Sequence, residues 1–542
     1  MKRNLRDFYF TIDLRSLALY RILLAFLLIW DWVARWPDLE AFYTSFGVLP
    51  VEAALPKPGG DFHFCLLDGV TTLLMVRAVF CVGLLFYVLF LLGYRTRTFH
   101  GLSLVFFTSV LSRNVMIRDG SVVVMATMLM WSLFLPTGNR FSLDALMRRL
   151  RHRAIAGAQP PPAEAQRSEP SLAALAIIAQ LGLIYFFTAA AKCGSTWKDG
   201  TALYYALNMD QIARPLGRWL AAQPLPLIKA LTWGSLATEF AALPLMLAPF
   251  AQPWLRRLAM AGLVALHLSI ALTSTLGFFS AAMVTAYALL LLPEDWERLK
   301  ALPDMSRIRS EVGELIAHQR NRVANWLWLS ASDVDGAMQA EARPDLEPAP
   351  AMRWWCRARG WTANSIVAVL FVTFTLDAYN LNMTRRLGRE RIPEPRWMRA
   401  IILVPLIQQD WELFAPDPTK DDGWWVIAGE TESGEQFDPL TGQVPTFDKP
   451  ADLAFRFDRF WRKYLDRIWL KKNYDYRLYF GKYVTRQNHH EKPEGQRLAR
   501  FHFYYVKELT QPPGTPQPWP TERRLLWRHE CFPSANPAKA ER

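Results

Sequence analysis

The feature that most constrains this chain is a series of long apolar segments. A helix that crosses a membrane needs roughly 20 mostly apolar residues, and about nine windows approach this length. The third, fourth and eighth windows are short, so they are also compatible with re-entrant or half-buried segments. The predicted spans lie near residues 16–34, 70–93, 98–113, 120–136, 171–191, 226–249, 256–274, 278–293 and 363–382. The pattern predicts an all-α polytopic membrane domain of about eight or nine transmembrane helices.

Composition requires a polar part beside the membrane part. Hydrophobic residues make up 51% of the 542 residues, yet the mean hydropathy is only +0.05. The net charge of +13 is too diluted, at 20% charged residues, for a nucleic-acid-binding arm. We therefore predict a transmembrane domain over residues 1–297, a cytosolic amphipathic helix and linker over 298–362, a last transmembrane helix over 363–383, and a β-rich extracytoplasmic domain over 384–542.

Basic residues in the short loops predict the orientation, because such loops carry more Lys and Arg on the cytoplasmic side. The N-terminus carries Lys2, and the loop after the fourth span carries Arg148 and Arg149, whereas Lys57 is nearly the only basic residue after the first span. This pattern places the N-terminus in the cytoplasm and the C-terminal domain outside. The arginine-rich stretch 385–391, just beyond the last span, argues the other way.

The polar tail has its own pattern. Apolar and polar residues alternate over 423–439 and 497–509, which predicts strands. Between them, the basic and aromatic stretch 451–472 predicts an amphipathic helix. Such a helix either lies on the bilayer surface or packs on the small sheet, and the sequence favours neither. Cys65 and Cys531 would both face outside, where they could pair.

Several ionisable residues lie at membrane depth. Each Arg, Lys or Asp at the centre of a spanning helix costs about 2.5–3.5 kcal/mol, so it faces a partner or a wet cavity. Structural pairing, for instance of Arg21 or Arg77 with Asp31, Glu239 or Asp377, explains most of this set.

Lys192 and His267 are the two candidates for chemistry. Lys192 ends an apolar run, and burial there would favour the neutral amine, which is a competent general base. The alternative is a lysine that extends to the lipid headgroups. His267 lies in the middle of a span, where a hydrogen bond to a neighbouring helix is the structural alternative. No metal-binding motif is present.

Taken together, several segments resemble the HTTM domain, the membrane domain shared by vitamin K-dependent gamma-carboxylases and many bacterial relatives. The resemblance covers about residues 9–293 and extends to a segment of the tail, QQDWELFAPDPTKDDGWWVIAG. It is carried in this order by YRILLAFLLIWD, FYTSFGVLP, SRNVMIRDGSVVVMATMLMWSLFLPTGNRFSLDAL, IYFFTAAAKCGSTWKDGTALYYAL and LHLSIALTSTLGFF.

The resemblance implies a chemistry. In the carboxylases a lysine base deprotonates vitamin K hydroquinone, and oxygen then forms a strongly basic alkoxide on the way to the epoxide. That base removes a proton from a glutamate side chain, and carbon dioxide adds to the carbanion. Lys192 matches the family's lysine in the register set by Tyr185, Phe186 and Trp197, and His267 matches a histidine near the quinone pocket.

The resemblance thus implies a quinol-dependent, gamma-glutamyl carboxylase-like enzyme of a bacterial inner membrane. Its cofactor would be a reduced vitamin K- or menaquinone-type quinol, and its partners the lipid bilayer and a Glu-containing peptide or protein, with no nucleic acid. Lys192 and His267 are the predicted catalytic residues, and Tyr185, Trp197, Asp119 and Arg113 the predicted pocket residues.

One departure concerns the carboxylation step. The animal enzymes have a further functional histidine in the segment that aligns with Ile117–Ser121, where this chain has Asp119. The rival hypothesis is a non-catalytic membrane protein that keeps the fold and acts as a scaffold or a lipid- or peptide-handling factor. The sequence alone leaves the natural substrate and the use of carbon dioxide open.

Overall fold

The computed structural model describes most of the chain, in nine stretches. Most of the predicted cytosolic helix and linker over 298–362 lies outside them. The described residues are 5–54, 62–156, 168–276, 278–301, 350–384, 388–411, 413–451, 453–489 and 492–531.

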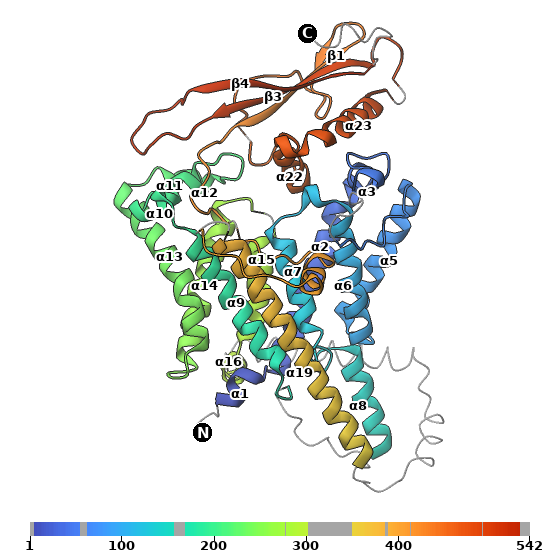
Figure 1. Cartoon of the computed structure of the whole chain (residues 1–542), viewed down its shortest axis with the longest axis vertical. Coiled ribbons are helices and arrows are strands. Elements are labelled where there is room, and N and C mark those ends of the chain that lie inside the picture. Colours follow the sequence, from blue (N-terminus) through green and yellow to red (C-terminus); the bar gives the residue numbers. More distant parts are fainter. Residues whose placement is uncertain are drawn as a thin grey trace.

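A bundle of apolar helices forms the body of the molecule (Figure 1). Within the described residues, six of its helices are long and apolar enough to cross a membrane, which makes this an integral membrane protein. They are α2 (Leu14–Arg35), α5 (Leu73–Leu92), α9 (Leu172–Ala191), α13 (Leu225–Leu247), α14 (Trp254–Thr273) and α19 (Pro350–Tyr379). Each overlaps one of the spans predicted from hydropathy, although α19 begins well before the predicted start at residue 363.

The three short windows also form helices, but they do not count among those six. They are α6 (Thr96–Arg113), α7 (Gly120–Ser132) and α15 (Phe279–Tyr287). The last two are largely buried among the longer helices, with residues such as Met128 and Met283 almost fully covered. Because the surrounding helices cover the apolar surfaces of α7 and α15, these two helices need not be long enough to match the bilayer thickness. The prediction of about nine spans is therefore not confirmed.

Local signals set several helix boundaries. The Thr72 hydroxyl accepts a hydrogen bond from the Met75 amide at the start of α5, and Ser171 does the same for Ala173 at the start of α9. At the end of α5, Gly93 adopts φ +67°, the left-handed conformation in which helices commonly stop. These caps explain why the predicted boundaries fall close to the observed ones.

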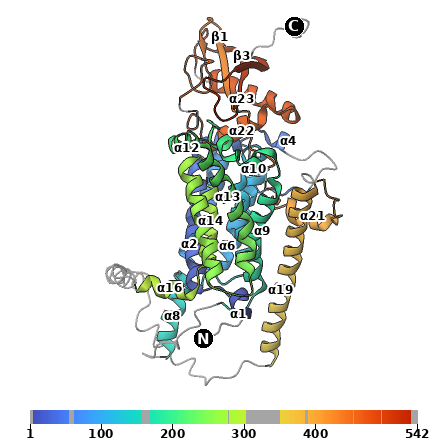
Figure 2. The ribbon, with the colours of Figure 1, turned by 90° about the vertical axis from the view of Figure 1, so that its left-hand side faces the viewer.

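Shorter helices lie at the two ends of the bundle. The N-terminal helix, α8 and α16 lie at one end, and α10, α11 and α12 lie at the other, beneath the C-terminal region (Figures 1 and 2). The bounds are α1 (Leu5–Phe10), α3 (Leu39–Tyr43), α4 (Val51–Ala54), α8 (Leu143–Ala156), α10 (Ser195–Asp199), α11 (Ala202–Leu207), α12 (Pro215–Ala221), α16 (Pro293–Lys300) and α21 (Arg396–Leu403).

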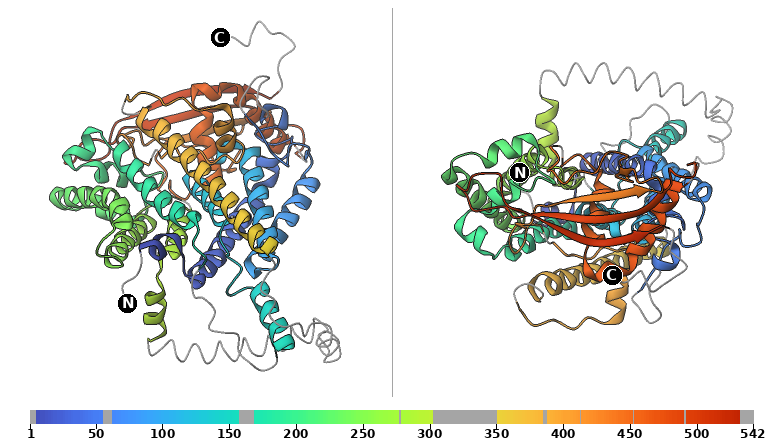
Figure 3. Two further views of the ribbon diagram at one scale, coloured as in Figure 1. Left: turned by 60° about the horizontal axis from the view of Figure 1, so that its bottom comes forward. Right: turned by 90° about the horizontal axis from the view of Figure 1, so that it is seen from above.

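The C-terminal region contains a small antiparallel sheet, which the views from the side and from above show lying across one end of the bundle (Figures 1 and 3). Its strand order is β2-β1-β3-β4. Trp424 pairs with Val506, and Phe503 pairs with Trp527. The strands are β1 (Trp424–Thr431), β2 (Gln436–Phe437), β3 (Leu498–Glu508) and β4 (Thr521–Glu530). The two predicted strand segments are thus confirmed as β1 with β2, and β3.

Two helices, α22 (Arg459–Ile468) and α23 (Arg477–His489), lie between this sheet and the bundle (Figure 1). In α22, Phe460, Tyr464 and Leu465 are buried, and the Trp461 indole donates a hydrogen bond to Asp38 at 2.9 Å. The amphipathic helix predicted over 451–472 is therefore α22, and it packs inside the protein between the sheet and the helix bundle.

The suggested cysteine pair does not form. Cys65 and Cys531 are both free thiols. Cys65 donates a hydrogen bond to the Ser109 carbonyl, and Cys531 accepts one from Thr485 on α23. Each sulfur is therefore held within its own part of the fold.

Candidate functional site

Lys192 directly follows α9 and is buried, with 7% of its surface exposed. Its ammonium nitrogen lies 2.6 Å from both carboxylate oxygens of Glu239 on α13. It also lies 4.5 Å from the centre of the Trp197 ring. The side chain thus points into the protein, toward a carboxylate and an aromatic face, and the sequence did not identify Glu239 as its partner.

The C-terminal region holds the segment that follows Lys192, which includes the short helix α10. The Trp197 indole donates to the Phe414 carbonyl at 3.0 Å, and the Thr196 amide donates to the Asp417 carboxylate at 2.9 Å. A side-chain carbon at Gly194 would meet that same carboxylate at 2.1 Å, so the close approach requires glycine. The segment after the last span therefore fixes the ring that lies against Lys192.

His267, in the middle of α14, is the centre of a second buried polar group. Its Nε2 lies 2.6 Å from the Tyr185 hydroxyl, and its Nδ1 lies 3.4 Å from the Ser280 hydroxyl. The Tyr185 hydroxyl also hydrogen-bonds that of Tyr287. Two side chains predicted for the site, Tyr185 and His267, are thus in direct contact.

Glu239 links the two groups. Its carboxylate interacts electrostatically with the hydroxyls of both Tyr185 and Tyr287, in addition to its ion pair with Lys192. Groups that exchange protons therefore lie close together inside an apolar bundle, on α9, α13, α14 and α15. Hydrogen bonds allow a proton to pass between the amine of Lys192 and the carboxylate of Glu239, and separately between Tyr185 and His267.

A cavity of about 350 Å³ lies where the bundle meets the C-terminal region. Phe279 lines it, and the ring of Phe279 is 5.4 Å from the ring of His267. Phe414 also lines it, and the carbonyl of Phe414 is the one that holds Trp197. Phe279 thus lies between the cavity and His267, and Phe414 with Trp197 lies between the cavity and Lys192.

The family model of the HTTM domain matches residues 9–296, more than half of the chain. The chain belongs to the HTTM-domain family. No curated protein and no solved structure matches it. The HTTM domain thus contains both polar groups, Lys192 with Glu239 and His267 with Tyr185, whereas Phe414 and Asp417 lie beyond it.

Asp119 lies in the HTTM domain at the rim of the cavity and begins α7. Its carboxylate accepts hydrogen bonds from the Ser121 and Val122 amides and lies 3.7 Å from Arg459 Nη1. Burial opposes its ionisation, yet Arg459 and the bonds from Ser121 hold the pKa of this carboxyl below its ordinary value. Asp119 is thus a charged acceptor and helix cap, a different role from that of a neutral histidine.

Arg113 of the HTTM domain stands apart from these groups. It is fully buried and donates to the carbonyls of Leu49 and Thr44, at 2.8 and 3.0 Å. It is not among the residues that line the cavity. The structure therefore brings together Lys192, Trp197, Tyr185 and His267, with Asp119 at the nearby cavity, and leaves Arg113 in a separate hydrogen-bonded position.

The structural ion pairs predicted for Arg21 and Arg77 do not form, and the carboxylates have other partners. Arg21 donates to backbone carbonyls, including that of Thr137 at 3.1 Å, and Arg77 is exposed. Asp31 pairs with Arg35 at 2.6 Å and with Arg459 of α22. The spacing of four residues between Asp31 and Arg35 was a signal that could have found the first pair.

A cluster of carboxylates joins the HTTM domain to the C-terminal region. Oxygen atoms of Asp210, Asp422 and Glu508 all lie within 4.8 Å of one another. Lys449 Nζ lies 2.5 Å from Asp210 and also bonds Glu508. The lysine ammonium thus occupies the position that a cation would take in this cluster.

Asp422 makes the stability of this junction depend on pH. Burial and the charge of Asp210 raise its pKa to about 7, although the amide of Asp210 and the ammonium of Lys449 favour the charged form. A carboxyl whose pKa is higher in the folded state binds more protons there, so the free energy of unfolding falls as pH rises from about 4 to about 7. Between about pH 5 and 7 the fall is roughly 2–3 kcal/mol.

We expect Asp422→Asn to flatten this dependence, because an amide oxygen still accepts from the Asp210 amide and carries no charge. Thermal unfolding midpoints of both proteins, measured across this pH range, check the expectation. Parallel pH profiles for wild type and variant would contradict it.

Proposed function

We propose that this HTTM protein is a membrane-embedded enzyme that oxidises a reduced menaquinone- or vitamin K-type quinol, with Lys192 as the base. The observation that carries the proposal is the buried Lys192–Glu239 pair beside the contact of Tyr185 with His267. These four side chains can all exchange protons, and they lie together in an apolar bundle although burying each polar group there costs free energy.

Glu239 provides a way to make Lys192 basic. When a proton moves from the ammonium to the carboxylate, the pair becomes a neutral amine and a neutral acid, with no change in net charge. A low dielectric favours the neutral pair more than water does. The free amine of Lys192 can then accept a proton from a hydroxyl of a bound substrate.

The other residues fit the binding of a quinol. We propose that His267 and Tyr185 hydrogen-bond a second ring hydroxyl in place of their bond to each other, and that the quinol ring packs on Trp197. In the resembling carboxylases the reduced quinone supplies the electrons that activate oxygen and ends as its epoxide. The surrounding bundle excludes water, which would otherwise quench a strong base.

The cavity of about 350 Å³ between the bundle and the C-terminal region suits the approach of a polar substrate from the aqueous side. It is lined by Arg459, Lys463 and Asp119, next to the apolar ring of Phe279. We propose that a Glu-containing peptide enters here and that the C-terminal region faces the outside of a bacterial inner membrane. The basic α8 and the N-terminal helix lie at the opposite end of the bundle, which supports this orientation (Figure 1).

One observation favours the rival function of a non-catalytic scaffold or lipid- or peptide-handling factor. The Lys192 ammonium contacts both oxygens of Glu239, which is the geometry of a fully satisfied structural ion pair. Such a pair orients α9 against α13 with no chemistry.

The test is a product analysis on the purified full-length protein in membrane vesicles. Reduced menaquinone or reduced vitamin K is added with oxygen, bicarbonate and a Glu-containing peptide, and quinone epoxide and peptide mass are measured. Epoxide together with a peptide mass gain of one carbon dioxide identifies carboxylation, and epoxide alone identifies quinol oxidation without it. If neither quinol is consumed faster than in empty vesicles, the rival function holds.

A further inference from the structure

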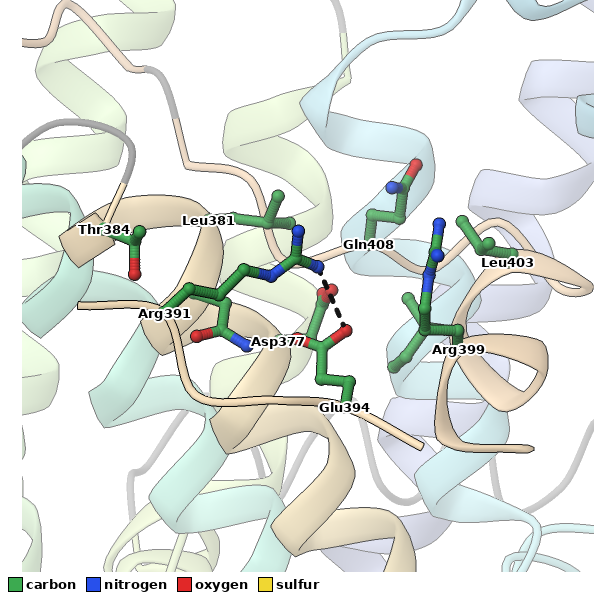
Figure 4. A pocket seen from close by; sticks show the side chains of 10 residues that line it. Asp377, Leu381, Thr384, Arg391, Glu394, Arg399, Leu403 and Gln408 are labelled. Atoms are coloured by element: carbon green, nitrogen blue, oxygen red, sulfur yellow. Dashed lines mark hydrogen bonds and ion pairs between the residues drawn. The ribbon is translucent and has the colours of Figure 1, made fainter. Parts of the chain in front are cut away.

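A polar cavity of about 330 Å³ lies at the C-terminal end of α19, far along the chain from the Lys192 site (Figure 4). It is formed by the last residues of α19, the turn that follows them, and α21. Its size is in the range of small-ligand sites. The polar side chains that line it include Asp377, Asn380, Arg391, Glu394, Arg399 and Gln408.

Two carboxylates line this cavity: Asp377 is buried, and the side chain of Glu394 is 9% exposed. Asp377 is 8% exposed and accepts a hydrogen bond from the Gln409 amide at 2.7 Å. Of the described residues, none forms an ion pair with Asp377. Glu394 accepts from Asn380 and lies 3.6 Å from Arg391 Nη2. A buried carboxylate without a cation at ion-pair distance favours a ligand that brings a positive group.

Two arginines, Arg391 and Arg399, flank the carboxylates, one on each side in Figure 4. The side chain of Arg391 is 61% exposed, and Arg399 is also exposed. Guanidinium groups recognise phosphate through paired hydrogen bonds. The cavity therefore presents negative charge within and positive charge at its rim.

The surroundings are those of a membrane interface. The cavity lies at the end of the candidate span Gly360–Thr384. Beside it, Ile392 and Trp397 are half-exposed, and Trp is enriched at membrane–water interfaces. Below it, α19 presents an exposed apolar stripe of Ile366, Val369 and Val372. Figure 2 shows α19 and α21 together at the edge of the bundle.

We propose that this cavity binds the headgroup of phosphatidylethanolamine. The phosphate lies against Arg391 and Arg399, the primary ammonium donates to Asp377 and Glu394, and the acyl chains follow the apolar stripe of α19. The inference goes beyond the proposed enzymatic function and does not depend on it.

The lining distinguishes this lipid from its relatives. Recognition of a quaternary ammonium uses aromatic faces, and the residues that line this cavity include no aromatic side chain. Phosphatidylcholine also has no N–H to donate to a carboxylate. Phosphatidylglycerol has the phosphate and lacks the ammonium that Asp377 would pair with.

The test measures binding of short-chain lipids to the detergent-solubilised full-length protein by native mass spectrometry. Phosphatidylethanolamine, phosphatidylcholine and phosphatidylglycerol with identical chains are compared, together with phosphoethanolamine and inorganic phosphate. We expect phosphatidylethanolamine to bind about tenfold more tightly than the other two lipids, the effect of one hydrogen bond to a charged group. Asp377→Asn should remove the preference for phosphatidylethanolamine. Arg391→Gln should weaken the binding of all three lipids by about tenfold.

Matched controls come from the same stretch of chain. Arg389→Gln and Glu390→Gln change exposed residues that do not line the cavity, so lipid binding should stay as in wild type. Arg391 is itself exposed, which keeps its variant informative if Asp377→Asn fails to fold. Equal binding of the three lipids, or unchanged binding in both cavity variants, would overturn the proposal. So would binding of phosphoethanolamine or inorganic phosphate as tight as that of the lipid.

Discussion

Replacement of Lys192 by methionine should reduce quinol oxidation to the background rate. Methionine keeps most of the side-chain volume and removes the only group in the site that can become a free amine. General base catalysis contributes roughly 10²–10⁴-fold to a rate, so a loss of this size is expected. The measurement is the initial rate of quinol consumption by purified protein in vesicles.

The control for this variant is Lys198→Met, on the nearby helix α10. Lys198 is exposed and has no part in the site, so its replacement should leave the rate unchanged. Lys192→Met also leaves Glu239 buried without its cation, which can affect folding. The double variant Lys192→Met with Glu239→Gln removes both charges, so it should fold and remain inactive. Wild-type turnover in either Lys192 variant would exclude its role as the base.

Replacement of Asp31 by alanine should strongly destabilise the bundle. Asp31 is 2% exposed, its carboxylate lies 2.6 Å from Arg35 Nε, and it also bonds Arg459 of the C-terminal region. Removing the carboxylate leaves two guanidinium groups together without their shared anion. Breaking a buried ion pair in this way costs about 3–5 kcal/mol.

The free energy of unfolding, measured by titration with SDS, tests this expectation. Asp7→Ala, at an exposed position on α1, is the control and should change it by less than about 0.5 kcal/mol. The pair Asp31→Leu with Arg35→Met should recover part of the loss, because Arg459 also has Asp119 nearby. If Asp31→Ala unfolds like wild type, the three-way ion pair does not stabilise the bundle.

Much of the fold could be predicted from the sequence because its signals are local. The apolar run predicted over 171–191 is the helix Leu172–Ala191, since length and hydropathy set the run and Ser171 caps it. The alternation over 497–509 is the strand Leu498–Glu508 for a similar reason. Hydropathy alone could not decide whether the short helices α7 and α15 cross a membrane.

The candidate site could be predicted only in part, because its partners come from distant parts of the chain. Lys192 and His267 were found from their own surroundings and from the family resemblance. Glu239 is 47 residues from Lys192, and Arg459 is 428 residues from Asp31, so no periodic pattern connects them. The contact of Trp197 with Phe414 was missed for the same reason.

The proposed role of the buried Lys192–Glu239 pair in quinol oxidation can be measured directly. The most direct measurement compares epoxide formation from reduced menaquinone by wild type and Lys192→Met, in identical vesicles with oxygen present. We expect epoxide with wild type and none above the level of empty vesicles with the variant. Equal epoxide from both proteins, or none from wild type with any tested quinol, would contradict it.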